Sequence, residues 1–180
     1  MTIDTAPTAE EIEAFVGRFA TDLGAVLHAA TVVVGDKLGL YQALAEHGPA
    51  TPAELAAATG CDERYLREWL SAQAASDYAK YDASTGRFHL DPAQAVCLAD
   101  PSHPAFMAGG MTVATSVHKD EEAVRSAFTT GRGVGWHEHH GDLFTGTERF
   151  FRPGYAANLT SAWIPALEGV EAKLQAGAIV

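Results

Sequence analysis

The residues best suited to chemistry lie close together in the second half of the chain. The run Trp136-His137-Glu138-His139-His140 places three imidazoles within four positions, and several aromatic residues follow it. Imidazole exchanges protons near neutral pH, so His137 and His140 are the candidate acid–base groups. Aromatic rings with polar handles line apolar pockets. The candidate substrate-binding residues are Trp136, His139, Phe151, Tyr155 and Asn158.

The same histidines allow a second reading, a metal site. His137 and His139 alternate as two ligands on one strand would, and Asp142 or Glu148 can add a carboxylate. Zinc and iron sites need a further ligand in a defined geometry, and no spacing such as His-Glu-x-x-His occurs. We therefore expect no metal. Core packing remains the competing explanation for the aromatic residues.

Composition limits the partners and the compartment. The chain has 180 residues and a formal net charge of −11, which opposes binding to phosphate backbones and to anionic membranes. No uninterrupted apolar run approaches the roughly 18 residues of a membrane span, and the start lacks the basic and apolar regions of a secretory signal. Cys61 and Cys97 are far apart and form no CxxC pair, which suits free thiols in the cytoplasm.

The elements that must position these residues are mostly helices. After a tail over residues 1–9, a helix is expected from Glu10, and residues 23–34 are apolar almost all round. A helix without a polar face must be covered, either by the chain's own core or by a second subunit, and we expect a homodimer through Leu23–Val34. Residues 35–44 predict a further helix. Residues 106–111 predict a helix whose small residues pack closely against a neighbour, and residues 121–128 predict another helix.

The region between residues 51 and 90 has the pattern of a winged helix. Thr51-Pro52-Ala53-Glu54 opens one helix with an N-cap, an N1 proline and a capping glutamate, and Asp62 caps the next. A strand, turn and strand follow across residues 78–90. The region holds six acidic and four basic residues, a balance that disfavours DNA binding and favours a packing module.

Several runs resemble the N-terminal domain of class I S-adenosylmethionine-dependent methyltransferases. The resemblance is nearest to an actinobacterial and mycobacterial group sometimes labelled transcriptional regulators because of its winged helix. It covers almost the whole chain from about Glu10. The runs are DKLGLY at 36–41, TPAELA at 51–56, ERYLREWL at 63–70, GVGWHEHH at 133–140, ERFFRPGY at 148–155 and WIPALEGV at 163–170.

The resemblance implies a mainly α fold, a winged-helix-like domain with a small β-hairpin wing and extra helices. It implies a helical dimerisation and winged-helix domain over residues 10–100 and a helical linker that caps the substrate over residues 101–175. Residues 176–180 would begin the first strand of a Rossmann-like domain that the sequence does not contain. The resemblance also implies that S-adenosylmethionine binds to the parent protein and that a small-molecule acceptor is methylated on oxygen.

No cofactor loop is expected in these 180 residues, so the chain alone is expected to be inactive and to hold no cofactor. The one glycine-dense stretch, residues 131–135, follows a predicted helix rather than a strand. Two alternatives stay open: a winged-helix DNA-binding regulator, and a stand-alone helical domain that binds small molecules or other proteins.

Overall fold

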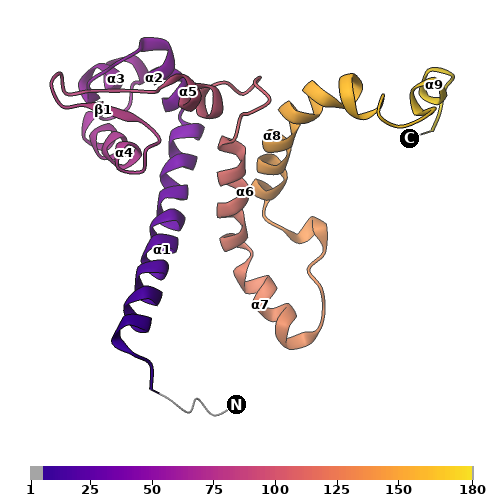
Figure 1. Cartoon of the computed structure of the whole chain (residues 1–180), viewed down its shortest axis with the longest axis horizontal. Coiled ribbons are helices and arrows are strands. Elements are labelled where there is room, and N and C mark those ends of the chain that lie inside the picture. Colours follow the sequence, from indigo (N-terminus) through magenta and orange to yellow (C-terminus); the bar gives the residue numbers. More distant parts are fainter. Residues whose placement is uncertain (1–5, 180) are drawn as a thin grey trace.

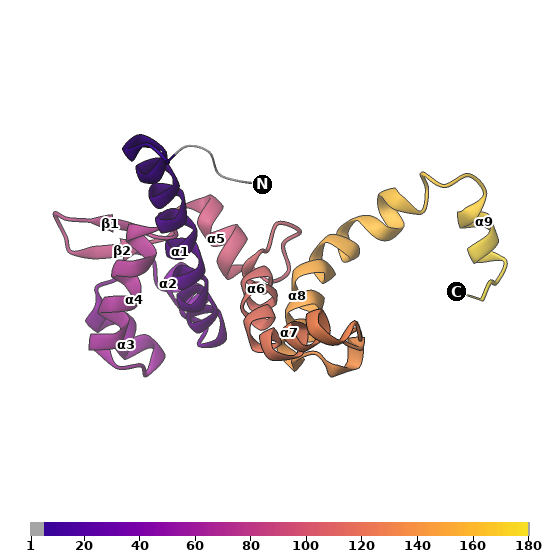
Figure 2. The same cartoon turned by 90° about the horizontal axis from the view of Figure 1, so that it is seen from below.

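The computed structural model describes residues 6–179. It is built from helices, with a single two-stranded sheet in the described part of the chain. Figure 1 shows a winged-helix body at one side, from which the long α1 extends. The helix α6 (Ala108–Lys119) lies beside α1 (Ala9–Lys37), α8 (Gly141–Asn158) lies beside α6, and the chain then leads to α9 (Val170–Gln175) at the far side, an arrangement also seen in Figure 2. The predicted mainly α fold is confirmed.

A single helix replaces the first two predicted segments. α1 (Ala9–Lys37) begins at a capping box in which Thr8 and Glu11 bond each other's backbone N–H groups. It runs for 29 residues without a break. The helix predicted over residues 35–44 is wrong in its continuity, because Gly39 has a φ of +68° and α2 (Leu40–His47) starts only after it. A residue in the left-handed conformation cannot continue an α-helix, and glycine adopts that conformation without steric cost.

The winged helix has the predicted order of elements. α3 (Pro52–Thr59) carries the Thr51–Glu54 capping box, and Asp62 caps α4 (Glu63–Ala75). The wing pairs β1 (Lys80–Asp82) with β2 (Arg87–His89) as an antiparallel hairpin. α5 (Pro92–Ala99) follows and begins at a capping box between Asp91 and Gln94, the same signature as at residues 51–54. This helix was not among the elements predicted from the sequence, although Asp91 and Gln94 signal its start.

The main core lies where α1, α2, α4 and the wing meet. Its buried hydrophobic residues are Val32, Leu40, Tyr41, Leu44, Ala50, Leu55, Leu66, Trp69, Leu70, Phe88 and Leu98. Buried polar groups are paired within it: the Tyr41 hydroxyl donates to Gln73 Oε1 (2.7 Å), and Gln73 Nε2 donates to Thr31 Oγ1 (3.0 Å). Burial raises the pKa of Tyr41, which keeps this hydroxyl protonated as a donor.

A second unit of packing joins α6 (Ala108–Lys119) and α8 (Gly141–Asn158), with α7 (Glu121–Thr130) between them in the chain. A Cβ at Gly109 would lie 2.8 Å from the backbone nitrogen of Phe150, and one at Gly146 would lie 2.8 Å from that of Val113. The two backbones therefore approach closely because both helices carry glycine at the crossing. The predicted close packing of the small-residue helix is confirmed, although that helix begins at Ala108 rather than Phe106.

Two ion pairs connect α1 to α8: Lys37 with Asp142, and the more buried Asp36 with Arg149. The Asp36 side chain is fully buried and accepts two hydrogen bonds from the Arg149 guanidinium, with Nη2 to Oδ1 at 2.8 Å. The guanidinium also lies over the Phe106 ring, 5.6 Å from its centroid. This pair fixes the position of α8 relative to the winged-helix body.

The last elements are short. A π-helical turn, η2 (Leu159–Trp163), continues α8, and α9 (Val170–Gln175) ends near Gly177, which has a φ of +93°. Ala178 and Ile179 have no regular structure, and Val180 lies outside the described residues, so the first strand expected over residues 176–180 stays a prediction. An isolated strand has no neighbour to satisfy its backbone groups, so these residues stay unpaired.

The outer half of α1 leaves many large apolar side chains exposed. Ile12, Phe15, Val16, Phe19, Leu23, Val26 and Leu27 are each about half exposed or more, whereas Ala29 and Val32 are buried by the chain itself. By length and composition, α1 is also the one helix in the described part that is apolar enough to cross a membrane. The sequence predicted no such span, and α1 meets the criterion because it joins two predicted segments. A single helix of this kind is weak evidence for a membrane span, because core helices and N-terminal signal sequences meet the same criterion.

Candidate functional site

The histidine cluster lies on a short connection between α7 and α8. Trp136–Glu138 forms a 3₁₀ turn, η1, and Trp136 is 62% exposed. The Trp136 indole meets the Phe144 ring edge-on at 5.1 Å between centroids, and meets the His139 ring at 6.0 Å. The connection is therefore a turn and not the strand that the metal-site hypothesis assumed. The Trp136 ring packs against Phe144 near the start of α8.

Asp120, at the junction of α6 and α7, anchors this connection. Its carboxylate bonds His139 Nδ1 at 2.8 Å and accepts the backbone N–H of His140 at 2.9 Å. The hydrogen bond from His139 is the largest cause that lowers the pKa of Asp120 below its usual value. With Nδ1–H donated to a carboxylate, the His139 Nε2 is left as the basic nitrogen.

His140 has a structural position at the start of α8. Its Nδ1 accepts the backbone N–H of Asp142 at 3.1 Å and so caps the helix. The Asp142 carboxylate in turn binds Lys119 at 2.6 Å and Lys37 at 3.2 Å, and these contacts lower its pKa, Lys119 most. An imidazole that caps through Nδ1 must have that nitrogen unprotonated, which ties the His140 ring to the helix end.

His137 is exposed, and no hydrogen bond holds its ring among the described residues. The three histidines thus occupy three different environments: His137 open to solvent, His139 paired with a carboxylate, and His140 at a helix cap. Among residues 6–179 no group of three or more His, Cys, Asp or Glu side chains is arranged to hold a metal ion.

A second cluster lies near the other end of α8. The Tyr155 ring meets the Trp163 ring edge-on at 5.2 Å and faces Phe151 at 6.5 Å. These three rings are each about half exposed and form a ladder that we call the α8 aromatic face. Asn158 ends the helix with Nδ2 donating to the Gly154 carbonyl at 2.9 Å. Trp163 was not among the predicted site residues; it joins this face because the π-helical turn brings its ring back toward Tyr155.

The candidate residues therefore fall into two groups on one helix. Phe144 marks the histidine cluster and Tyr155 marks the aromatic face, and the eleven positions from Phe144 to Tyr155 correspond to a rise of roughly 16 Å along an α-helix. Pro153 lies inside the helix, between Phe151 and Tyr155 of the aromatic face. The structure brings Trp136 and His139 together, and separately Phe151 and Tyr155.

The cations of the winged helix are largely paired. Arg67 binds Glu63 on the same helix, Arg87 binds Glu54 through two 2.7 Å contacts, and Lys80 binds Asp77. Three of the four basic side chains between residues 51 and 90 thus already face carboxylates. A helix that reads DNA presents such cations to phosphates and base edges instead.

Comparison with known proteins agrees with this fold. Residues 26–100 match the model of the family described as Rv2258c-like winged HTH domain. That stretch therefore has the winged-helix fold that the sequence predicted. No curated protein sequence matches the chain significantly.

Solved structures match a longer part of the chain. The mitomycin 7-O-methyltransferase MmcR is 21% identical with a TM-score of 0.57, and CalO1, a methyltransferase in calicheamicin biosynthesis, is 24% identical with a TM-score of 0.58. Each match covers 81% of this chain and 46% of the other. The dimethyltransferase RosA from Streptomyces davawensis is 24% identical with a TM-score of 0.54, over 84% of this chain and 46% of RosA. The chain thus shares their fold while spanning about half of their length.

Proposed function

We propose that this chain is the dimerising and substrate-capping part of an S-adenosylmethionine-dependent methyltransferase that acts on a small-molecule acceptor, by O-methylation. The observation that carries this is the shared fold over four-fifths of the chain with MmcR and CalO1, both methyltransferases. The chain corresponds to less than half of either, so the chemistry would depend on the remaining part of such a protein.

The cofactor would belong to that remaining part. The described residues contain no strand that leads into a glycine-rich loop and a helix, which is the arrangement that lets a backbone approach a nucleotide. Residues 131–135 follow α7 directly, and Gly135 lies against the side chains of His137 and Glu138.

The dimer would form through α1. The predicted interface, Leu23–Val34, is partly covered by the chain itself, since Ala29 and Val32 are buried. The exposed apolar stripe begins earlier, at Ile12, and continues to Leu27. An exposed apolar stripe of this length on a highly charged chain is stabilised when another apolar surface packs against it. The α1 helix of a second copy offers such a surface. We place such a dimer in the cytoplasm, in keeping with the two free cysteines.

The substrate cap would be the α8 aromatic face. Phe151, Tyr155 and Trp163 offer apolar area with hydroxyl and indole handles, and Asn158 closes the same end of the helix. His139, oriented by Asp120, is the best placed base of the histidine cluster, ahead of the predicted His137 and His140. Because the two groups are about 16 Å apart, only one of them can lie at the reacting atom of a small acceptor.

A DNA-binding regulator is the alternative function that the winged helix raises. The chain's net charge of −11 and its paired cations argue against it. A stand-alone helical binding domain would share the fold without a catalytic partner.

Sedimentation equilibrium tests the proposal. We expect a mass near twice the 19.0 kDa of the chain, and expect Phe15→Asp to shift the equilibrium toward the monomer by at least about tenfold, because a carboxylate would be buried in an apolar interface. Phe128→Asp is the matched control, since Phe128 is 88% exposed on α7, away from α1. A monomeric wild type, or duplex DNA binding that weakens steeply with salt, would overturn the proposal.

A further inference from the structure

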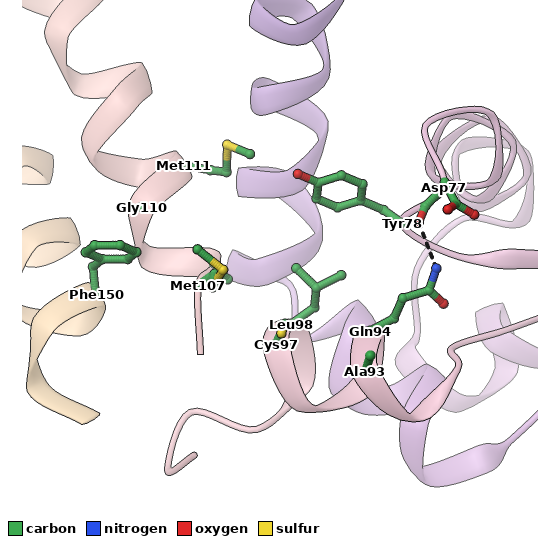
Figure 3. Close-up of a pocket in the computed structure, with 11 residues that line it drawn as sticks. Asp77, Tyr78, Ala93, Gln94, Cys97, Leu98, Met107, Gly110, Met111 and Phe150 are labelled. Atoms are coloured by element: carbon green, nitrogen blue, oxygen red, sulfur yellow. Dashed lines mark hydrogen bonds between the residues drawn. The ribbon is translucent and has the colours of Figure 1, made fainter. Parts of the chain in front are cut away.

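A cavity of about 460 Å³ lies between the winged-helix body and the α6–α8 pair. Figure 3 shows its walls: Cys97 and Leu98 from α5, Met107 and Met111 from the start of α6, Phe150 from α8, and Tyr78 from the turn before the wing. We propose that this cavity is a binding site for a planar, uncharged aromatic molecule that carries one hydrogen-bonding group. The cavity adjoins the α8 aromatic face, because the Phe150 and Phe151 rings lie 5.0 Å apart, and the inference does not rest on methyl transfer.

The volume of the cavity sets the size of the ligand. An apolar cavity of about 150 Å³ is enough to hold benzene. The present cavity is about three times larger, which corresponds to two or three fused or linked rings. Ligand pockets in proteins commonly fall in the range of about 300–1,000 Å³, so the space is ordinary for a small molecule.

The walls favour an aromatic ligand. Two thioethers, Met107 and Met111, face the space together with the Phe150 ring and the Cys97 thiol. Sulfur atoms are polarisable and make favourable contacts with ring edges, and methionine adapts its shape to the ligand that it meets. Phe150 is held in place by the close crossing of α6 and α8, where a Cβ on Gly110 would lie 3.1 Å from its ring.

The charge state follows from the polar groups at the rim. No Lys, Arg or His side chain lines the cavity, and the one carboxylate, of Asp77, is 78% exposed and paired with Lys80. Gln94 is engaged on both sides, with Nε2 donating to the Asp77 carbonyl at 2.7 Å and Oε1 accepting from the Asp91 backbone. A charged ligand would therefore find no side chain of opposite charge in the cavity, whereas an uncharged ligand needs no such partner.

Tyr78 supplies the group that hydrogen-bonds the ligand. Its hydroxyl projects toward Met111 across the space in Figure 3, and no hydrogen bond engages it within residues 6–179. The His28 ring meets the Tyr78 ring edge-on at 4.6 Å and 75°, which fixes the direction of that hydroxyl. A preoriented hydroxyl at one end of an apolar space selects a ligand with an acceptor or donor at the matching end.

Fluorescence titration with N-phenyl-1-naphthylamine tests the site. We expect saturable binding of one probe per chain at micromolar concentration. Ala93→Trp, which places a ring in the cavity mouth, should weaken it by at least about tenfold. Ala53→Trp is the matched control, because both alanines are exposed and follow the N1 proline of a short helix, and Ala53 is remote from the cavity.

Displacement of the probe tests the polar end. Tyr78→Phe should weaken 2-naphthol about fivefold, the usual worth of one net hydrogen bond, and leave naphthalene unchanged. Absent probe binding, equal binding by the two tryptophan variants, or equal loss of both competitors in Tyr78→Phe would overturn the inference. Probe binding by Phe15→Asp but not by wild type would also overturn it, because a second copy of α1 would then be the occupant. That last result leaves the proposed dimer intact, so the two proposals fail separately.

Discussion

Removing the Arg149 guanidinium should be among the most damaging single changes in this protein. Arg149 donates two hydrogen bonds to the Asp36 carboxylate, and the Asp36 side chain has no exposed surface. In Arg149→Met the carboxylate stays buried without its counter-charge. Breaking a buried ion pair in this way costs about 3–5 kcal/mol, and we expect about 3 kcal/mol because the Arg149 side chain is itself 32% exposed.

Urea unfolding followed by tryptophan fluorescence measures this cost, since Trp69 is part of the main core. For a chain of this size, about 3 kcal/mol corresponds to a fall of roughly 6–12 °C in Tm. Arg152→Met is the matched control: it lies on the same helix and pairs with Glu148, but its side chain is 76% exposed, so a change within about 0.5 kcal/mol is expected.

The double variant Asp36→Leu with Arg149→Met separates the pair from the packing around it. Replacing both charges with apolar groups removes the unpaired carboxylate, so the double variant should be more stable than Arg149→Met by at least about 1 kcal/mol. The reasoning is refuted if Arg149→Met costs no more than Arg152→Met, or if the double variant is the least stable of the three.

Two further predictions concern packing and pH. Gly109→Ala should lower the free energy of unfolding by about 1–3 kcal/mol, because the added methyl group meets the α8 backbone. Gly154→Ala, with open space around it, should raise the free energy of unfolding by up to about 1 kcal/mol. Equal effects of the two variants in urea unfolding would contradict the close crossing. Because the pKa of Asp120 is lowered, its pairing with His139 stabilises the fold above the ordinary pKa of 3.8, and this stability is lost as pH falls through the lowered pKa. Asp120→Asn should therefore make the unfolding midpoint depend less on pH between about pH 5 and 3. Glu122→Gln should leave that pH dependence unchanged.

The winged helix could be predicted because its signals are local. The capping residues Thr51 and Asp62 and the strand, turn and strand pattern specify helix starts and a hairpin without reference to distant contacts. The same kind of signal at Asp91 and Gln94 marks the start of α5, so this helix could also have been predicted from the sequence.

The candidate site could be predicted only in part because its contacts are long-range. The histidine run was visible, but the carboxylate that orients His139 lies 19 positions earlier, at Asp120, in a charged stretch that gave no sign of its partner. Similarly, Trp163 reaches Tyr155 only because α8 continues as a π-helical turn, which no periodic pattern indicates.

The Asp36–Arg149 pair shows the same limit on a larger scale. Both residues fell within runs noted for their resemblance to a known family, yet nothing in either run indicates that they meet across 113 positions. Close crossings were easier to foresee, because glycines such as Gly109 in an otherwise apolar helix predict a near neighbour, although they do not say which one.

The central claim, that this chain caps the acceptor in a methyltransferase, is tested most directly by methyl transfer. The full-length gene product is incubated with labelled S-adenosylmethionine and a panel of planar phenols, and kcat/KM for the acceptor is compared between wild type and Tyr155→Ala. The account predicts transfer that Tyr155→Ala lowers by about tenfold or more, with the KM for the cofactor unchanged and Tyr65→Ala, on the exposed face of α4, without effect. Absence of transfer to every acceptor, or transfer that Tyr155→Ala leaves unaltered, would contradict it.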